Sequence, residues 1–169
     1  MRIYHGSIER VEKPEIRILK HRTLDYGYGF YTTTSYEQAF SWVRRKLDKI
    51  HNKGFINIYD FDENNIKNLK VLNFEQPTEE WVDFVMKNRT QKEFIHDYDL
   101  VFGPVANDRV YAAFALFEGG LIDKQMLISE LKAYKLVDQY LFHTIKALQS
   151  ICFVEAKEVY YDESDNQSK

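Results

Sequence analysis

The chain has 169 residues, of which 44 % are hydrophobic, 29 % are charged and 15 % are aromatic, and its formal net charge at pH 7 is −3. This mild acidity argues against dominant sequence-independent binding of nucleic acid, which requires a basic face, but it leaves a nucleic-acid substrate open. The single cysteine, Cys152, excludes an intrachain disulfide and a zinc site built from several thiolates.

Length and hydropathy favour a single cytoplasmic domain. A chain of this size is long enough for one packed core and short for two. It opens with MRIYHGS rather than with a secretory leader, and no apolar run approaches the roughly 18 residues that cross a bilayer. We therefore expect one domain over residues 1–161, no membrane partner, and a polar tail at 162–169 that frays.

Hydrophobic periodicity and turn residues predict strands and helices in a mixed order. In SYEQAFSWVRRKLDKI, Ser35 is a good N-cap and apolar residues recur at helical spacing. Gly54 is expected to end that helix, and Cys152 to be a small buried residue of the last strand. Because the order is not a regular βαβ alternation, the pattern favours an α+β fold. The expected elements are strands at 2–7, 29–34, 55–62, 68–75, 98–106, 138–144 and 151–161, and helices at 35–50, 77–89, 107–120, 123–132 and 145–150.

Most motifs that identify an enzyme class are absent from the sequence. The stretch GYGFYT supplies two glycines of a dinucleotide-binding fingerprint, but it lacks the third and opens a strand. No P-loop, HExxH or GxSxG motif occurs. The five histidines lack the spacing of metal ligands, so we expect no metal site.

Three short stretches suit the walls of a small-molecule cleft: His5-Gly6-Ser7, the run GYGFYT at 27–32, and Trp42 on the following helix. A glycine leaves its main-chain N–H and C=O accessible to a flat amide. A histidine can donate to a sugar hydroxyl, and a tyrosine can stack on an aromatic ring. Together these parts suit a nicotinamide riboside, whereas each one alone is more typical of a strand end or a plain hairpin.

Four blocks of the sequence, YHGS, TLDYGYGFYTTTSYEQAFSWV, FGPVANDRVY and DQYLFHTIKAL, resemble the DUF3990 family of small bacterial proteins over nearly the whole chain. That family is similar to the ADP-ribosyltransferase superfamily, in particular to its His-Tyr-Glu branch, which includes diphtheria toxin and the poly-ADP-ribose polymerases. The resemblance implies a split β-sandwich with flanking helices around an NAD cleft, and NAD as the substrate.

The resemblance also implies roles for residues of the first two blocks. His5 would contact a ribose hydroxyl of NAD, and Gly6 would hold the carboxamide through its main chain, with Ser7 completing the motif. In the second block, GxGFYTT, Tyr31 would stack on the nicotinamide ring and Thr32 follows it in the same strand.

Two further residues complete the implied site. Trp42 lies eleven residues after Tyr31, where this branch often has a second aromatic residue on the other side of the ring. The transferases then use a Glu at the start of a late strand to stabilise the transition state, and the matching residue here is Gln139, beside Asp138. A neutral amide stabilises positive charge less than a carboxylate. Gln139 therefore favours single transfer over chain elongation, or a site that binds NAD without turnover, or it is only a polar residue at a strand start.

The sequence also suggests roles for charged residues near these blocks. Arg17 or Arg22 would meet the pyrophosphate of NAD, and Asp25 would tie the glycine hairpin in place. The block FGPVANDRVY has two interpretations, which are a helix cap at Asn107 or Asp108, or a phosphate- or target-binding cluster of Asn107, Asp108, Arg109 and Tyr111.

The function expected from these residues is mono-ADP-ribosyl transfer from NAD to a protein or nucleic-acid acceptor. Families of this kind often include toxins, so a cognate antitoxin protein is an implied partner. Two alternatives stay open: a non-catalytic module that binds NAD, ADP-ribose or a partner protein, and an NAD glycohydrolase that uses water as the acceptor.

Overall fold

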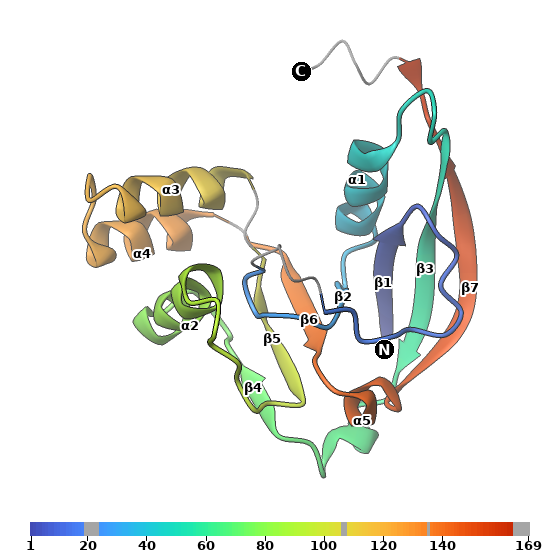
Figure 1. The fold of residues 1–169 in the computed structure, drawn as a ribbon, viewed down its shortest axis with the longest axis horizontal. Helices are drawn as coiled ribbons and strands as arrows, with labels where there is room; N and C mark the ends of the chain where they lie inside the picture. The colour runs from blue at the N-terminus through green and yellow to red at the C-terminus, as the bar shows by residue number, and fades with distance from the viewer. Residues whose placement is uncertain (19–23, 106–107, 135, 164–169) are drawn as a thin grey trace.

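The structure, a computed structural model, describes residues 1–18, 24–105, 108–134 and 136–163, with residues 108 and 109 described by their backbone only. It is a mixed α+β protein with two separate sheets that lie side by side (Figure 1). Its elements in chain order are β1 (Arg2–Ser7), β2 (Phe30–Thr32), α1 (Tyr36–Lys46), β3 (Lys53–Phe61), the 3₁₀ helix η1 (Glu63–Ile66), β4 (Val71–Asn73), α2 (Glu79–Thr90), β5 (Leu100–Pro104), α3 (Asp108–Glu118), α4 (Lys124–Ala133), β6 (Asp138–Phe142), α5 (Ile145–Leu148) and β7 (Ile151–Tyr160).

The first sheet has three antiparallel strands in the order β1-β3-β7, and α1 packs on it. The Ser35 hydroxyl accepts a hydrogen bond from the Gln38 N–H and caps the helix, as the sequence predicts. The prediction that Gly54 ends this helix is wrong, because α1 stops at Lys46 and Gly54 lies in β3. A Cβ on Gly54 would lie 2.5 Å from a Val43 methyl group, so this glycine allows the helix to approach the sheet closely.

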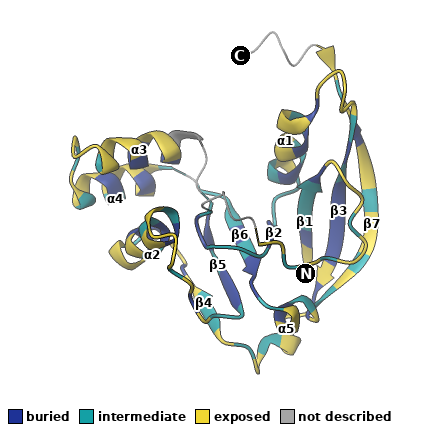
Figure 2. Ribbon diagram, viewed as in Figure 1, coloured by how far each residue is buried: buried dark blue, intermediate teal, exposed yellow. Residues whose placement is uncertain are grey.

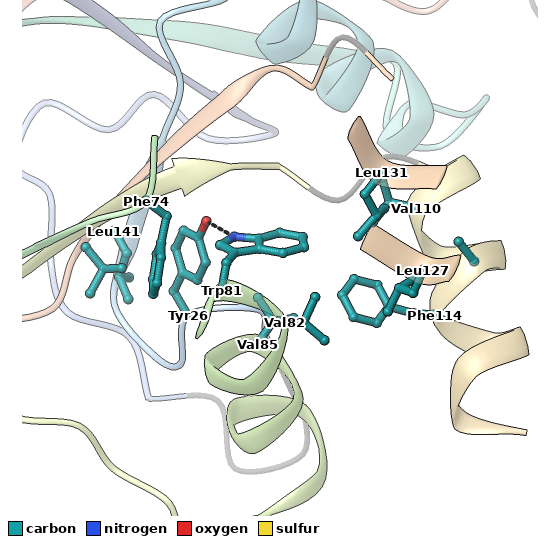
Figure 3. Packing of buried hydrophobic residues seen from close by; sticks show 12 residues of the cluster. Tyr26, Phe74, Trp81, Val82, Val85, Val110, Phe114, Leu127, Leu131 and Leu141 are labelled. Carbon is teal, nitrogen blue, oxygen red and sulfur yellow. Dashed lines mark hydrogen bonds between the residues drawn. The ribbon is translucent and has the colours of Figure 1, made fainter. Parts of the chain in front are cut away.

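The second sheet has four strands in the order β2-β6-β5-β4, of which only the β4–β5 pair is parallel. The apolar run that predicts an inner strand is β5, which lies between β6 and β4. One core packs this sheet against α2, α3 and α4, and Figure 3 shows the side chains that meet there, including Tyr26, Trp81, Phe114 and Leu141.

Tyr26 ties the chain before β2 into this core. Its hydroxyl accepts a 2.7 Å hydrogen bond from Trp81 Nε1 and donates to the Pro104 carbonyl oxygen at 2.9 Å. Both rings are fully buried. The loop that precedes β2 is therefore anchored by a satisfied polar contact inside an apolar core.

A second core joins the two sheets. Ile3, Tyr59 and Phe61 come from the three-stranded sheet, and they pack against Phe30, Leu100 and Phe142 of the four-stranded sheet. Along one side the sheets also share a short edge contact, a single bridge between Tyr4 and Thr33. Among the described residues, no further bridge pairs β1 with β2.

The predicted α+β class and most predicted elements are confirmed, but the prediction of a buried Cys152 is wrong. Cys152 lies in β7 as expected and is exposed, because β7 is an edge strand that buries few of its residues (Figure 2). Most of the predicted polar tail, residues 164–169, lies outside the described residues. Within the part of the chain that the structure describes, no helix is long and apolar enough to cross a membrane.

We expect Tyr26→Phe to lower the free energy of unfolding by about 1–3 kcal/mol, because the buried Trp81 N–H then loses its acceptor. Urea denaturation measures the change. The control is Tyr160→Phe, at a side chain that is 60 % exposed, which should change stability by less than about 0.5 kcal/mol. Equal stability of the two variants would contradict the anchoring role of Tyr26.

Candidate functional site

A cavity of about 530 Å³ opens where β1 and β2 separate. Its size falls within the range of small-molecule sites, about 300–1,000 Å³. Its walls come from β1, β2, α1, the connector after β1 and the loop that carries Asp25, and they include most predicted site residues: His5, Gly6, Ser7, Tyr31, Thr32, Trp42 and Gln139. The structure therefore brings together residues that are as far as 134 positions apart in the sequence.

The separation of β1 from β2 leaves main-chain groups of Gly6 available. Tyr4 and Thr33 exchange two hydrogen bonds, at 2.8 and 2.9 Å, and β2 then turns away. Residues two apart in a strand direct their N–H and C=O to the same side. Gly6 therefore directs both groups toward β2 and the cavity rather than toward β3. An adjacent donor and acceptor on an open strand edge match the two hydrogen-bonding groups of a primary amide.

Gly6 is also required by the packing of α1. A Cβ at this position would lie 2.4 Å from the Ala39 carbonyl oxygen and 3.0 Å from a Val43 methyl group. The missing side chain thus admits the helix, while the main chain of the same residue faces the cavity. The sequence indicates that the main chain of Gly6 is accessible, but it does not indicate that the missing side chain makes room for α1.

The His5 side chain is neutral and makes a hydrogen bond to β2. Its Nδ1 lies 2.7 Å from the Tyr31 carbonyl oxygen, so Nδ1 carries the proton and donates it. Burial lowers the pKa of His5 to about 4, and the positive charges of Lys46 and Arg17 act in the same direction. Nε2 of this tautomer is an acceptor. A sugar hydroxyl at Nε2 would therefore donate to His5, whereas the sequence led us to expect His5 as the donor.

Tyr31 has a fixed ring and a neutral phenol. Its hydroxyl donates to the Gly27 carbonyl oxygen at 2.7 Å and accepts from the Tyr26 N–H at 3.1 Å. Burial raises the pKa of Tyr31 well above its usual value, and the negative charge of Asp25 adds to this. The phenol hydroxyl is therefore engaged with the hairpin, and Tyr31 is one of the residues that line the cavity.

Trp42 lies on the exposed face of α1, with 37 % of its surface accessible. The Lys46 ammonium and the Arg45 guanidinium lie 5.1 and 5.6 Å from its ring centroid. Trp42 and Tyr31 both line the cavity. That the two rings enclose one flat ligand stays a prediction.

Two adjacent histidines, His96 and His143, make hydrogen bonds to the main chain of the glycine hairpin. His96 Nε2 lies 2.7 Å from the Tyr26 carbonyl oxygen, and His143 Nδ1 lies 2.7 Å from that of Tyr28, with the imidazole centroids 4.1 Å apart. Burial lowers the pKa of His96 to about 4. Sequence reasoning missed both residues, because nothing in their local pattern indicates contacts with a hairpin about 70 and 115 positions away.

Gln139, the third of the predicted catalytic residues, lies close to two oxygen atoms of other residues. Its Nε2 lies 3.3 Å from the Pro104 carbonyl oxygen and 3.5 Å from Oδ2 of Asp25. Asp25 is a buried residue that lines the cavity. The neighbouring Asp138 has a structural role, because its carboxylate accepts hydrogen bonds from the main chain and hydroxyl of Thr34 just before α1.

Positively charged side chains line the cavity, but they differ in part from those that the sequence predicts. Arg17 lines it and pairs with Glu9 at 2.8 Å. Lys46, which the sequence did not indicate, also lines it. Arg22 lies outside the described residues, as do Asn107 and the side chains of residues 108 and 109. Tyr111, the remaining member of the predicted cluster at 107–111, lines the cavity.

The Thr32 hydroxyl is exceptional among the buried polar groups of the described residues. The residue is buried and lines the cavity, and its Oγ1 has no hydrogen-bond partner among the described residues. Buried hydroxyls in native proteins nearly always have a partner. In the described ranges, no group of three or more His, Cys, Asp or Glu side chains is arranged to hold a metal ion.

These features define a class, a two-sheet α+β protein with a polar and aromatic cleft between the sheets. Residues 1–153 match the family described as "Protein of unknown function (DUF3990)", and the chain belongs to this family. No curated protein and no solved structure matches the chain.

We expect Gly6→Ala to destabilise the protein by about 1–3 kcal/mol, because the added methyl group overlaps the α1 backbone. Thermal unfolding measures the loss. Gly119→Ala is the control, since its Cβ would meet its nearest atom at 3.2 Å and its φ is negative. A Gly6→Ala protein as stable as the Gly119→Ala protein would contradict the close helix contact.

Stability should fall as the pH is lowered from about 6.5 towards 4. The folded state keeps His5 and His96 neutral down to about pH 4, whereas the unfolded chain takes up protons near pH 6.5. Each histidine then contributes a slope that approaches about 1.4 kcal/mol per pH unit. Urea unfolding at pH 5.0–7.5 measures the slope, which His5→Asn should roughly halve. A flat profile would contradict the buried neutral state.

Proposed function

We propose that this protein is an NAD-dependent mono-ADP-ribosyltransferase. The observation that carries the proposal is the open strand edge at Gly6, whose N–H and C=O face a cavity that Tyr31 and Trp42 also line. A carboxamide on a flat ring requires a paired donor and acceptor beside a stacking surface. The motif resemblance to the His-Tyr-Glu transferases supports the same ligand.

The residues would bind the dinucleotide as follows. The main chain of Gly6 holds the carboxamide, and Tyr31 and Trp42 contain the nicotinamide ring between them. Nε2 of His5 accepts a hydrogen bond from a ribose hydroxyl. Arg17 and Lys46 offer positive charge to the pyrophosphate. This arrangement bends the dinucleotide and exposes C1′ of the nicotinamide riboside.

Catalysis would depend on positioning and on charge stabilisation. The nicotinamide of NAD⁺ carries a positive charge and leaves as a neutral molecule, so its departure needs no general acid. The protein holds C1′ open to an acceptor, which supplies much of the rate gain by proximity. By the family resemblance the acceptor is a protein or a nucleic acid, and a cognate antitoxin would regulate the enzyme.

A second candidate is a module that binds NAD or ADP-ribose without turnover. The contacts of Gln139 favour it, because its amide is buried and directed at Asp25 and Pro104 rather than offering a charge of its own. Nicotinamide release separates the candidates. NAD binding without release supports the module, and release without labelling of any macromolecule supports an NAD glycohydrolase.

We expect NAD to raise the melting temperature, and Trp42→Ala to weaken NAD binding about 5- to 150-fold, the equivalent of about 1–3 kcal/mol for the loss of one stacking face. Tyr31→Ala should abolish nicotinamide release. Calorimetric titration measures the NAD affinity, and a nicotinamide assay measures the release. Phe40→Ala is the matched control, because Phe40 is an aromatic residue of α1 that does not line the cavity. Equal NAD affinity of the Trp42→Ala and Phe40→Ala proteins would contradict the assignment of this cavity as the NAD site.

A further inference from the structure

A buried carboxylate, that of Asp25, lies at the wall of the cavity beside Gln139. It comes from the loop before β2, and 8 % of its side chain is exposed. Oδ1 lies 3.4 Å from Nη1 of Arg89, and Oδ2 lies 3.5 Å from Nε2 of Gln139. Two polar side chains from separate elements therefore orient this carboxylate, which lies beside the end of the side chain at residue 139.

The Arg89 guanidinium behind Asp25 is held by other groups as well. It is shared with Glu118, whose carboxylate lies 3.8 Å from Nε. Packing fixes the guanidinium, which lies 5.0 Å from the Tyr111 ring centroid and 5.4 Å from that of Phe114. Among the described residues, Asp25 and Tyr111 line the cavity and Arg89 does not, so the negative group faces the ligand space.

We propose that Asp25 is the catalytic carboxylate of this site, and that Gln139 and Arg89 are its positioning residues; this rests on the proposed transfer from NAD. The C1′–N bond to the pyridinium breaks, and both of its electrons pass to the ring nitrogen, which releases neutral nicotinamide. A lone pair of the acceptor forms the new bond to C1′, and the acceptor proton passes to solvent. Asp25 stabilises the positive charge that develops at C1′ between these two events.

Gln139 is suited to positioning and not to this charge stabilisation. A carboxamide is neutral, and its N–H group is directed at Asp25. An N–H donor beside a developing cation would raise its energy, whereas an N–H donor beside a carboxylate orients the anion. The amide at 139 and the carboxylate at 25 thus divide between two residues what one acidic residue does in the related transferases.

The test compares Asp25→Asn, Gln139→Glu and the double variant Asp25→Asn/Gln139→Glu with the parent protein. NAD affinity is measured by calorimetry and nicotinamide release by single-turnover assay. We expect Asp25→Asn to keep NAD affinity within about 3-fold and to slow release at least about 100-fold, the usual cost of a lost electrostatic stabiliser. The double variant, which returns a carboxylate from the neighbouring residue, should recover release at least about 10-fold.

A purely structural role for Asp25 predicts a different pattern. Release per folded molecule would then stay at the parent level in Asp25→Asn, or the second substitution would restore nothing, and either result overturns the assignment. If Asp25→Asn does not fold, the pH profile of Gln139→Glu decides. Two adjacent carboxylates raise one another's pKa, so the acid limb of release should move to higher pH, and an unchanged limb overturns the assignment.

The parent protein separates the two proposals. If it releases nicotinamide and Asp25→Asn does so equally fast, the role of Asp25 fails and the transferase proposal stands. If the parent binds NAD and never releases nicotinamide, the binding module replaces the enzyme and the role of Asp25 fails with it. If the parent does not bind NAD, the ligand assignment itself is wrong.

Discussion

The separation of β1 from β2 after the Tyr4–Thr33 pair is the constraint on which the rest of the site depends. Continued pairing would have consumed the main-chain groups of Gly6 and closed the cavity. The His5 imidazole bridges to the Tyr31 carbonyl oxygen instead, which keeps the strands connected without sealing the space between them. Because α1 packs directly on Gly6, the same residue sets how far Trp42 lies from the strand edge.

The wall opposite β1 depends on a second set of contacts. The Tyr31 phenol, His96 and His143 each bond a main-chain atom of the glycine hairpin, and burial favours the neutral form of Tyr31 and of His96. Charged groups also line the cavity. Asp25 is buried in the cavity wall, whereas the Arg17 side chain is 61 % exposed and pairs with Glu9.

Local patterns predicted most of the fold and part of the site. The helix cap Ser35 acts through a contact three residues away, so sequence alone reveals it. Local signals failed where a distant neighbour decides the outcome. Gly54 was interpreted as a helix stop because its role, contact with Val43 of α1, arises only when the helix folds back onto the sheet. Cys152 was expected to be buried because its neighbours are apolar, and only the strand order shows that β7 is an edge.

The sequence by itself determined the α+β class, most elements, family membership and the candidate residues His5, Gly6, Tyr31 and Trp42, because these depend on short-range patterns and motifs. The tertiary structure alone decided that these residues share one cavity, that His5 is an acceptor at Nε2, and that Asp25, Gln139 and Arg89 meet. The physical reason is that a charge pair or a strand edge depends on packing between segments as far as 114 residues apart, and no local pattern encodes that distance.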